Sequence, residues 1–286
     1  MSTQEPNEKK NLYFIDHESG AEMARLLDHD RYITKGMGGL LSERSNDFSG
    51  LHRVLDLGCG PGGWVQEVAF ANPEVEAVGV DISQQMIAYA QMQARVQGLS
   101  NAQFRVMDIR QHLDFPNDYF GLVNARQIAF LPPSAWPAFL RECLRITRPG
   151  GFLRFTETEG NISNSPAEER MALLFHQALA RTGQSFSPTG QFLGISPVLP
   201  SLLREDGCQN VQITGHVIEY SAGTEAHPFV LKNEEGFFKL MQPFLVHVGM
   251  ATQEEVDDLY NQMLFEMKQD SFRGMHLLFT TYGQKP

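Results

Sequence analysis

The sequence is poor in cysteine, in long apolar runs and in positive charge. Its three cysteines, Cys59, Cys143 and Cys208, fit neither a zinc site nor an even disulfide framework, so we expect reduced, buried thiols. No run of 18 apolar residues occurs, and no membrane-spanning helix is expected. The 23 Lys and Arg residues against 34 Asp and Glu residues leave a net charge of −11, which argues against nucleic acid or an anionic membrane as a partner.

Targeting and metal-binding signals are also lacking. The opening stretch MSTQEPNEKKNLYF has no apolar core of a signal peptide, and together with the cysteine usage this predicts a cytoplasmic protein. None of the nine histidines forms an H-x-x-x-H pair or clusters with cysteine, so no metal site is predicted. Hydrophobic residues at 42% and charged residues at 20% are ordinary for a globular chain.

From residue 53 onward, apolar strand-like runs alternate with amphipathic helical patterns. This alternation predicts a parallel sheet with helices on both faces, so the expected fold class is α/β, a doubly wound, mostly parallel seven-stranded sheet. Helices are expected over 63–71, 83–97 and 134–146, and a turn over 148–151. The expected strands are 53–57, 75–80, 102–107, 120–124, 152–156, 211–220 and 275–282.

Extra material surrounds this core. Capping signals at Ser19–Glu22, Ser165–Glu168 and Thr252–Glu255 each predict the start of a further helix. The expected organisation has four parts, which are an N-terminal arm and lid over 1–50, a cofactor-binding core over 51–220 with a helical insertion at about 160–197, a helical substrate cap over 221–272, and the last core strand over 273–286.

The most informative motif runs from Val54 to Gly63 and reads VLDLGCGPGG. A strand there ends in a glycine-rich turn that opens a helix, and Gly58 and Gly60 let the backbone turn sharply and approach a ligand closely. Asp81 ends the next strand about 20 residues after the glycines, where an acid accepts hydrogen bonds from ribose hydroxyls.

Asp108 ends the third strand, where a carboxylate can accept a hydrogen bond from an adenine amino group. Asp56, Asp81 and Asp108 therefore lie at the carboxyl-terminal ends of three consecutive strands. Because ligands of open α/β sheets bind at the carboxyl edge of the strands, these three acids predict an adenosine-type ligand at that edge.

At these residues the sequence resembles the class I S-adenosylmethionine-dependent methyltransferases of the ubiquinone/menaquinone-biosynthesis type. The matching words are VLDLGCGPGG, VGVDIS, VMDI and RITRPGG, which together cover residues 53 to about 158. The resemblance implies S-adenosyl-L-methionine as cofactor and S-adenosyl-L-homocysteine as product. It implies that Asp56, Gly58, Cys59 and Gly60 surround the methionine part, that Asp81, Ile82 and Met86 hold the ribose and adenine, that Asp108 and Ile109 hold the adenine edge, and that Asn124, Ala125, Arg126 and Gln127 flank the sulfonium.

The chain departs from that family's pattern in two places. Gly121 follows the Phe of the fourth strand where the family often has Asp, and Trp64 follows the glycines where a small or hydroxyl residue is usual. Neither departure touches the three carboxylates. Arg126 has two competing interpretations, which are pairing with the carboxylate of the cofactor and pairing with a neighbouring acid of the protein.

Two other function classes compete with a methyltransferase. A nicotinamide-dependent oxidoreductase shares the glycine turn and the acid after the second strand, but it does not explain Asp108 or the Arg148–Gly151 turn. The second alternative is a protein that binds S-adenosylmethionine without methyl transfer, such as a regulator or a cyclase.

The predicted substrate is a small, apolar or aromatic organic molecule, because the 221–272 segment is rich in bulky apolar residues such as Phe237, Phe238 and Met241. The same apolar surface leaves a homo-oligomer open as an alternative use. Tyr13 is the first candidate for a catalytic base, ahead of His17, His29, Glu157 and Glu159. The acceptor atom and the natural substrate are left open.

Overall fold

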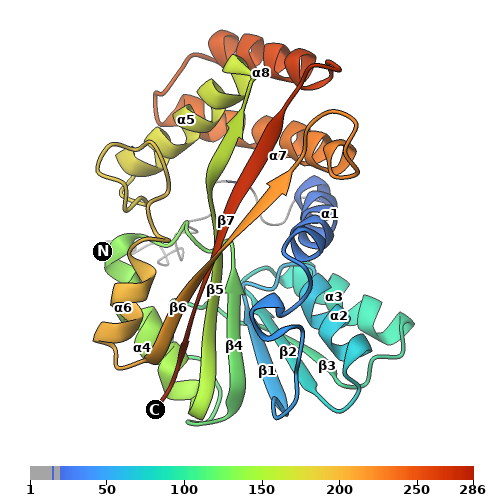
Figure 1. Ribbon diagram of the computed structural model, residues 1–286, viewed down its shortest axis with the longest axis vertical. Coiled ribbons are helices and arrows are strands. Elements are labelled where there is room, and N and C mark those ends of the chain that lie inside the picture. Colours follow the sequence, from blue (N-terminus) through green and yellow to red (C-terminus); the bar gives the residue numbers. More distant parts are fainter. Residues whose placement is uncertain (1–14, 16–19) are drawn as a thin grey trace, which may run out of the picture.

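A single seven-stranded sheet organises the computed structural model, which describes residue 15 and residues 20–286. The strand order is β3-β2-β1-β4-β5-β7-β6, and β7 runs antiparallel to both of its neighbours while the other pairs are parallel (Figure 1). This is the predicted doubly wound fold. The strands are β1 (Arg53–Leu57), β2 (Glu76–Asp81), β3 (Ala102–Val106), β4 (Phe120–Arg126), β5 (Thr147–Ser163), β6 (Gln209–Glu219) and β7 (Gly274–Gln284).

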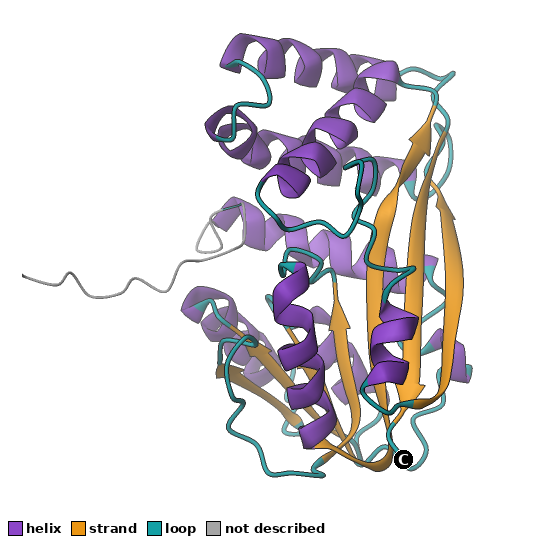
Figure 2. Cartoon of the chain, turned by 90° about the vertical axis from the view of Figure 1, so that its left-hand side faces the viewer, coloured by secondary structure: helices purple, strands orange, loops and turns teal. Residues whose placement is uncertain are grey.

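Helices cover both faces of the sheet and its upper end (Figures 1 and 2). One apolar core joins the strands to α4 and α6, and another joins them to α2 and α3. Above the carboxyl ends of β1 and β4 lie α1, α5, α7 and α8. The helices are α1 (Gly20–Gly36), α2 (Gly63–Ala71), α3 (Gln84–Val96), α4 (Trp136–Ile146), α5 (Pro166–Arg181), α6 (Leu199–Glu205), α7 (His227–His247) and α8 (Gln253–Met267), with short 3-10 turns η1 (Ser42–Arg44) and η2 (Pro133–Ala135).

The predicted helix starts rest on side-chain caps. Ser83 Oγ accepts the backbone N–H of Met86 at 3.1 Å before α3, and Ser165 Oγ accepts that of Glu168 at 3.0 Å before α5. Thr252 and Glu255 form the complete capping box of α8. These local bonds satisfy amides that have no partner within the helix, which is why the starts can be predicted from a few residues.

β5 is the largest departure from the predicted elements. A strand was expected over 152–156 and a turn over 148–151, but β5 runs through both and on to Ser163. Its extension to Ser163 pairs antiparallel with β7, from Phe152–Gln284 to Ser163–Gly274 with a shift in register between Thr158 and Gly160, and its first residue, Thr147, pairs with Phe120 of β4. Pairing with a strand more than a hundred residues away lies outside any local pattern.

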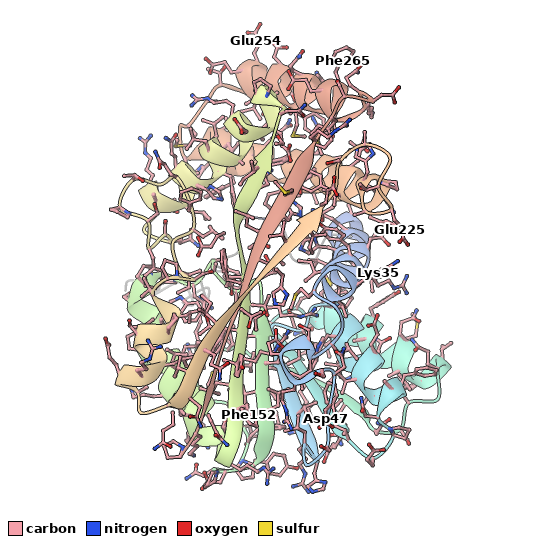
Figure 3. All side chains as sticks on the ribbon, viewed as in Figure 1. Lys35, Asp47, Phe152, Glu225, Glu254 and Phe265 are labelled. Atoms are coloured by element: carbon pink, nitrogen blue, oxygen red, sulfur yellow. The ribbon has the colours of Figure 1, made fainter. Side chains whose placement is uncertain are left out.

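The lid and cap segments share one apolar core. Side chains of α1, α5, α7 and α8 pack together with β7, and among them Met241, Leu245, Met263 and Met267 are fully buried. Outside this core, Lys35 of α1 pairs with Glu225 just before α7 (Figure 3). α1 is thus attached to α7 as well as to α2. None of the described helices is long and apolar enough to cross a membrane.

Candidate functional site

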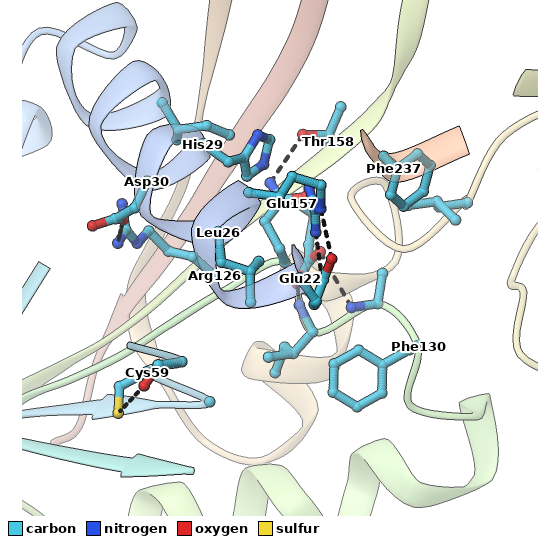
Figure 4. A pocket seen from close by; sticks show the side chains of 18 of the residues that line it. Glu22, Leu26, His29, Asp30, Cys59, Arg126, Phe130, Glu157, Thr158 and Phe237 are labelled. Atoms are coloured by element: carbon cyan, nitrogen blue, oxygen red, sulfur yellow. Dashed lines mark hydrogen bonds and ion pairs between the residues drawn. The ribbon is translucent and has the colours of Figure 1, made fainter. Parts of the chain in front are cut away.

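A cavity of about 320 Å³ lies at the carboxyl edge of the parallel strands, roofed by α1, α5 and α7. Its size is that of a small-ligand site, and the sheet edge is where open α/β folds bind ligands. One end is formed by the glycine turn and the ends of β2 and β3, and the other end by side chains of α1, β5, α5, α7 and β7 (Figure 4).

The glycine turn presents bare backbone to the cavity. Gly58 and Gly60 have φ values of 69° and 51°, in the left-handed region that favours glycine. The turn is held by β2, since the amides of Gly58 and Cys59 both donate to the carbonyl of Val80, at 2.8 and 2.9 Å. A Cβ at Gly58 would lie 3.4 Å from Ile128, and one at Gly60 would lie 3.7 Å from Leu26; both neighbours line the cavity, so a side chain here would occupy ligand space.

Asp81 joins the turn to the second strand. Its two carboxylate oxygens accept the amides of Gly60 and Ser83, each at 2.9 Å, and the residue also lines the cavity. A carboxylate has about four lone-pair sites, so these two bonds alone do not exhaust its acceptor capacity. Ile82 and Met86 line the cavity beside it.

Asp108 and Ile109 also line the cavity, but Asp108 has a partner that the sequence did not predict. Its oxygens accept Arg110 Nε at 2.8 Å and Arg110 Nη2 at 2.9 Å. This fork-like pair fixes the orientation of the carboxylate and uses part of its acceptor capacity. Cys59 lines the cavity too, and burial beside Asp81 and Asp56 raises the pKa of its thiol.

Asp56 heads a buried polar chain beneath the glycine turn. It accepts Asn124 Nδ2 at 2.7 Å, Asn124 Oδ1 accepts Arg154 Nη1 at 2.8 Å, and Arg154 Nε pairs with Glu43 at 3.0 Å. Burial raises the pKa of Asp56 to about 6. Asn124 and Ala125 were expected to flank the sulfonium, but both are fully buried and neither lines the cavity. The structure gives Asn124 a different position, behind Asp56.

Arg126 lines the cavity and pairs with an acid of the protein. Its Nη2 binds Asp30 of α1, and its Nη1 donates to Thr34 Oγ1 at 3.0 Å. Of the two interpretations of Arg126, the structure shows the second, and it brings α1 onto the end of β4 (Figure 4). Asp30 came from a segment with no motif, so sequence reasoning missed this partner.

The far end of the cavity carries a second polar group that the sequence did not predict. Arg25 binds both oxygens of Glu22, at 2.8 and 2.7 Å, donates to Asn233 Oδ1 at 2.8 Å, and lies 5.3 Å from the ring centre of Phe237. Their spacing on α1 puts Glu22, Arg25 and His29 on one helical face, which is the only signal that could have grouped them.

Glu234 and His276 complete this wall. His276 Nε2 lies 3.6 Å from Glu234 Oε1, and its Nδ1 shares a hydrogen bond of 2.8 Å with the Tyr32 hydroxyl. All three residues are buried, and Glu234 and His276 line the cavity. These contacts hold each side chain in one orientation, because Nδ1 of His276 is bound to Tyr32 and its Nε2 faces the Glu234 carboxylate.

The structure divides the candidate bases into those that line the cavity and those that do not. Tyr13 and His17 lie outside the described residues, while His29 and Glu157 line the cavity. Glu157 accepts the amides of Ile128 and Ala129 at 2.9 and 3.2 Å, and burial raises its pKa to about 8. Glu159 does not line the cavity; it accepts the amides of Gly194 and Ser196 at 2.7 and 2.6 Å instead.

Comparisons with known proteins show similarity to methyltransferases. Residues 54–151 match a family described as a methyltransferase domain. The chain is 33% identical over 132 residues to a malonyl-[acyl-carrier protein] O-methyltransferase of Legionella pneumophila, covering 45% of each chain. It is 31% identical over 107 residues to a demethylmenaquinone methyltransferase of Geobacillus kaustophilus, covering 37% of this chain and 45% of that one. The chain spans only 36% to 45% of the length of the first curated relatives it matches.

A solved structure extends the likeness to the whole fold. The phosphoethanolamine N-methyltransferase 2 of Haemonchus contortus superposes with a TM-score of 0.59 at 16% identity, covering 96% of this chain and 60% of that chain. This likeness concerns the fold, because the identity is low. The comparisons thus show a methyltransferase domain over residues 54–151 and, for the whole chain, the fold of that solved methyltransferase.

Proposed function

We propose that the chain binds S-adenosylmethionine at the glycine-turn end of the cavity and transfers its methyl group to a small organic molecule at the far end. The observation that carries this proposal is the continuity of one cavity, from Gly58 and Asp81 at one end to His29 and Phe237 at the other. A cofactor and an acceptor placed at the two ends would meet inside a single enclosure.

The residues present fit the cofactor. The open space over Gly58 and Gly60 suits its methionine part, and Asp81 would hold the ribose hydroxyls. Ile82 and Met86 would contact the adenine, with Asp108 at its edge. Asn124 would act indirectly, by holding Asp56 in place.

When bound, S-adenosylmethionine supplies an electrophilic methyl group on a positively charged sulfur. The protein positions the acceptor and keeps water out of the site. Both are needed because transfer requires the acceptor in line with the methyl group at about 3 Å, in a site that excludes water. α1, α5 and α7 close the cavity from above, and Phe130, Phe175 and Phe237 give its far end apolar walls. These walls support an apolar or aromatic substrate, and the net charge of −11 supports a small molecule over nucleic acid.

The parts of the chain then have separate tasks. We propose that 51–220 and 273–286 form the cofactor-binding core, that 1–50 acts as a lid, and that 221–272 acts as a cap that selects the substrate. Support comes from the cavity lining, since α7 contributes to the far end, the ends of β2 and β3 contribute to the glycine-turn end, and α1 lies along both.

Calorimetry with S-adenosylmethionine, S-adenosylhomocysteine and NAD tests the cofactor. We expect saturable heat with both adenosyl ligands and none with NAD; saturable NAD binding without heat from either adenosyl ligand would make the oxidoreductase alternative correct. Formation of S-adenosylhomocysteine with the molecule that co-purifies, identified by mass spectrometry, then tests transfer. A bound acceptor that is never methylated would leave a regulator or a cyclase instead.

A further inference from the structure

We propose that the methyl acceptor is a hydroxyl group and that His29 accepts its proton through Nε2. This inference rests on the proposed function and specifies its substrate class. It depends on which polar groups at the far end of the cavity already have hydrogen-bond or ion-pair partners and which do not.

The side chain of His29 has no hydrogen-bond partner among the described residues. It lies on α1 with Leu26 and Ile33, and all three line the cavity (Figure 4). Its Nδ1 is inaccessible and has no hydrogen-bond partner among the described residues. Nε2 is not among the inaccessible atoms and has no such partner either, so it is the ring nitrogen that can meet a ligand. A half-buried histidine whose inaccessible ring nitrogen has no hydrogen bond is unusual and calls for an explanation.

Most of the other titratable groups around the far end already use their acceptor atoms in hydrogen bonds. His276 uses one ring nitrogen toward Tyr32 and the other toward Glu234. His176 Nδ1 lies 2.9 Å from the carbonyl of Gln191. Both oxygens of Glu157 accept backbone amides. Of the described histidines that line the cavity, His29 and His176 keep Nε2 without a hydrogen bond. His29 is the one on α1, the helix whose Leu26 lies against Gly60 of the glycine turn, so it is the one placed toward the cofactor end.

The charges of this end favour a hydroxyl over a carboxylate. Each of the three guanidiniums that line the cavity is already paired with an acid: Arg25 with Glu22, Arg126 with Asp30 and Arg110 with Asp108. Glu234 adds a further carboxylate to the wall. An incoming carboxylate would meet these acids with no unpaired guanidinium to receive it, whereas a hydroxyl can donate to an acceptor.

The protonation state of His29 suits the step. Burial, together with Arg25, His276 and Arg126, holds the pKa of the imidazole well below its usual value, so the ring is neutral near pH 7. The O–H proton moves to Nε2 and its electron pair stays on oxygen, which forms the bond to the methyl carbon as the sulfur keeps the electrons of the bond that breaks. The imidazolium then returns its proton to water.

Binding of three matched probes tests the inference independently of turnover. On protein saturated with S-adenosylhomocysteine, 4-methylphenol should bind roughly tenfold more tightly than 4-methylanisole, which lacks the donor, and more tightly than 4-methylbenzoate. In His29→Leu, which has no side-chain acceptor, the phenol and the anisole should bind with about equal affinity. In His227→Leu, which replaces a part-buried histidine outside the cavity, the advantage of the phenol should be unchanged.

Turnover supplies a second readout. With 4-methylphenol, His29→Gln should lower kcat by roughly 10²-fold, the contribution of a general base. At alkaline pH, 4-nitrophenol is already ionised and needs no base, so its turnover should fall much less in the same variant.

Three results would overturn the inference: tighter binding of the benzoate, a phenol-to-anisole ratio that His29→Leu leaves unchanged, or binding of none of the probes. If S-adenosylhomocysteine still binds, each of these results refutes the hydroxyl acceptor and the role of His29, but leaves the proposed function standing. Failure of the wild-type protein to bind S-adenosylhomocysteine would refute the proposed function itself.

Discussion

Asp81 holds the glycine turn through the amide of Gly60 and faces the cavity with the same carboxylate. We predict that Asp81→Ala weakens S-adenosylhomocysteine binding by about 1.5–3 kcal/mol for each charged hydrogen bond removed. Calorimetry measures the change, and Asp114→Ala, an exposed acid outside the cavity, is the control. Unchanged affinity with a native melting profile would show that Asp81 does not hold the ribose.

Glu157 gives the stability of the protein a pH dependence. Burial favours its neutral form, so its pKa rises from 4.5 in the unfolded chain to about 8 in the folded one. Between these values the folded state binds a proton that the unfolded state has released, so stability is highest at the acidic end and falls as the pH rises through this window.

The neutral variant Glu157→Gln should lose this contribution. Urea unfolding at several pH values from about 4.5 to about 8 should show the wild type losing stability relative to the variant as the pH rises. Glu254→Gln, on an exposed position of α8, is the matched control and should keep the slope of the wild type. A slope shared by wild type and Glu157→Gln would show that Glu157 is ionised in the folded protein.

At the scale of elements, α7 has two faces with different tasks. Phe237 and Phe238 line the cavity, whereas Met241 is fully buried among α5, α8 and β7. The apolar richness of 221–272 therefore does not mean that all of these residues meet substrate. Met241, expected from sequence to influence the substrate, instead belongs to the core.

We predict that Phe237→Ala changes activity on the substrate with unchanged affinity for S-adenosylhomocysteine. Met241→Ala should instead lower the free energy of unfolding by about 2–5 kcal/mol, the cost of a large cavity in a packed core. Substrate kinetics, calorimetry and urea unfolding on both variants separate the two effects. If Phe237→Ala changes only the oligomeric state in light scattering, with turnover per site intact, the face is an interface.

At the scale of the molecule, α1 connects the two ends of the cavity. It packs on α2 and α7, pairs with β4 through Asp30 and Arg126, and contributes Leu26 and His29 to the lining. A ligand in the cavity would contact α1 directly, so binding should suppress local opening of this helix.

We predict that S-adenosylhomocysteine slows amide hydrogen exchange in α1 and in the glycine turn, and leaves α6, which does not line the cavity, unchanged. Mass spectrometry of peptides from the free and bound protein measures it. Equal slowing everywhere would indicate global stabilisation, and no slowing in α1 would show that the helix does not cover the ligand.

Local sequence determined the elements and one end of the site. The caps at Ser83, Ser165 and Thr252 and the alternation of patterns depend on neighbouring residues, so the helix starts and the α/β class followed from them. The glycine turn and Asp81 were found for the same reason, since the turn, strand and acid lie within one stretch of chain. Their roles toward a ligand remain predictions.

Tertiary structure alone decided the rest. The length of β5 depends on β7, the position of Asn124 on Arg154 and Glu43, and the partner of Arg126 on α1. His29 looked like any other histidine until α1 was seen over the cavity, with the neighbouring acids and guanidiniums already paired. Contacts between distant segments leave no periodicity or spacing in the chain, because their energy depends on packing and desolvation that exist only once the segments meet.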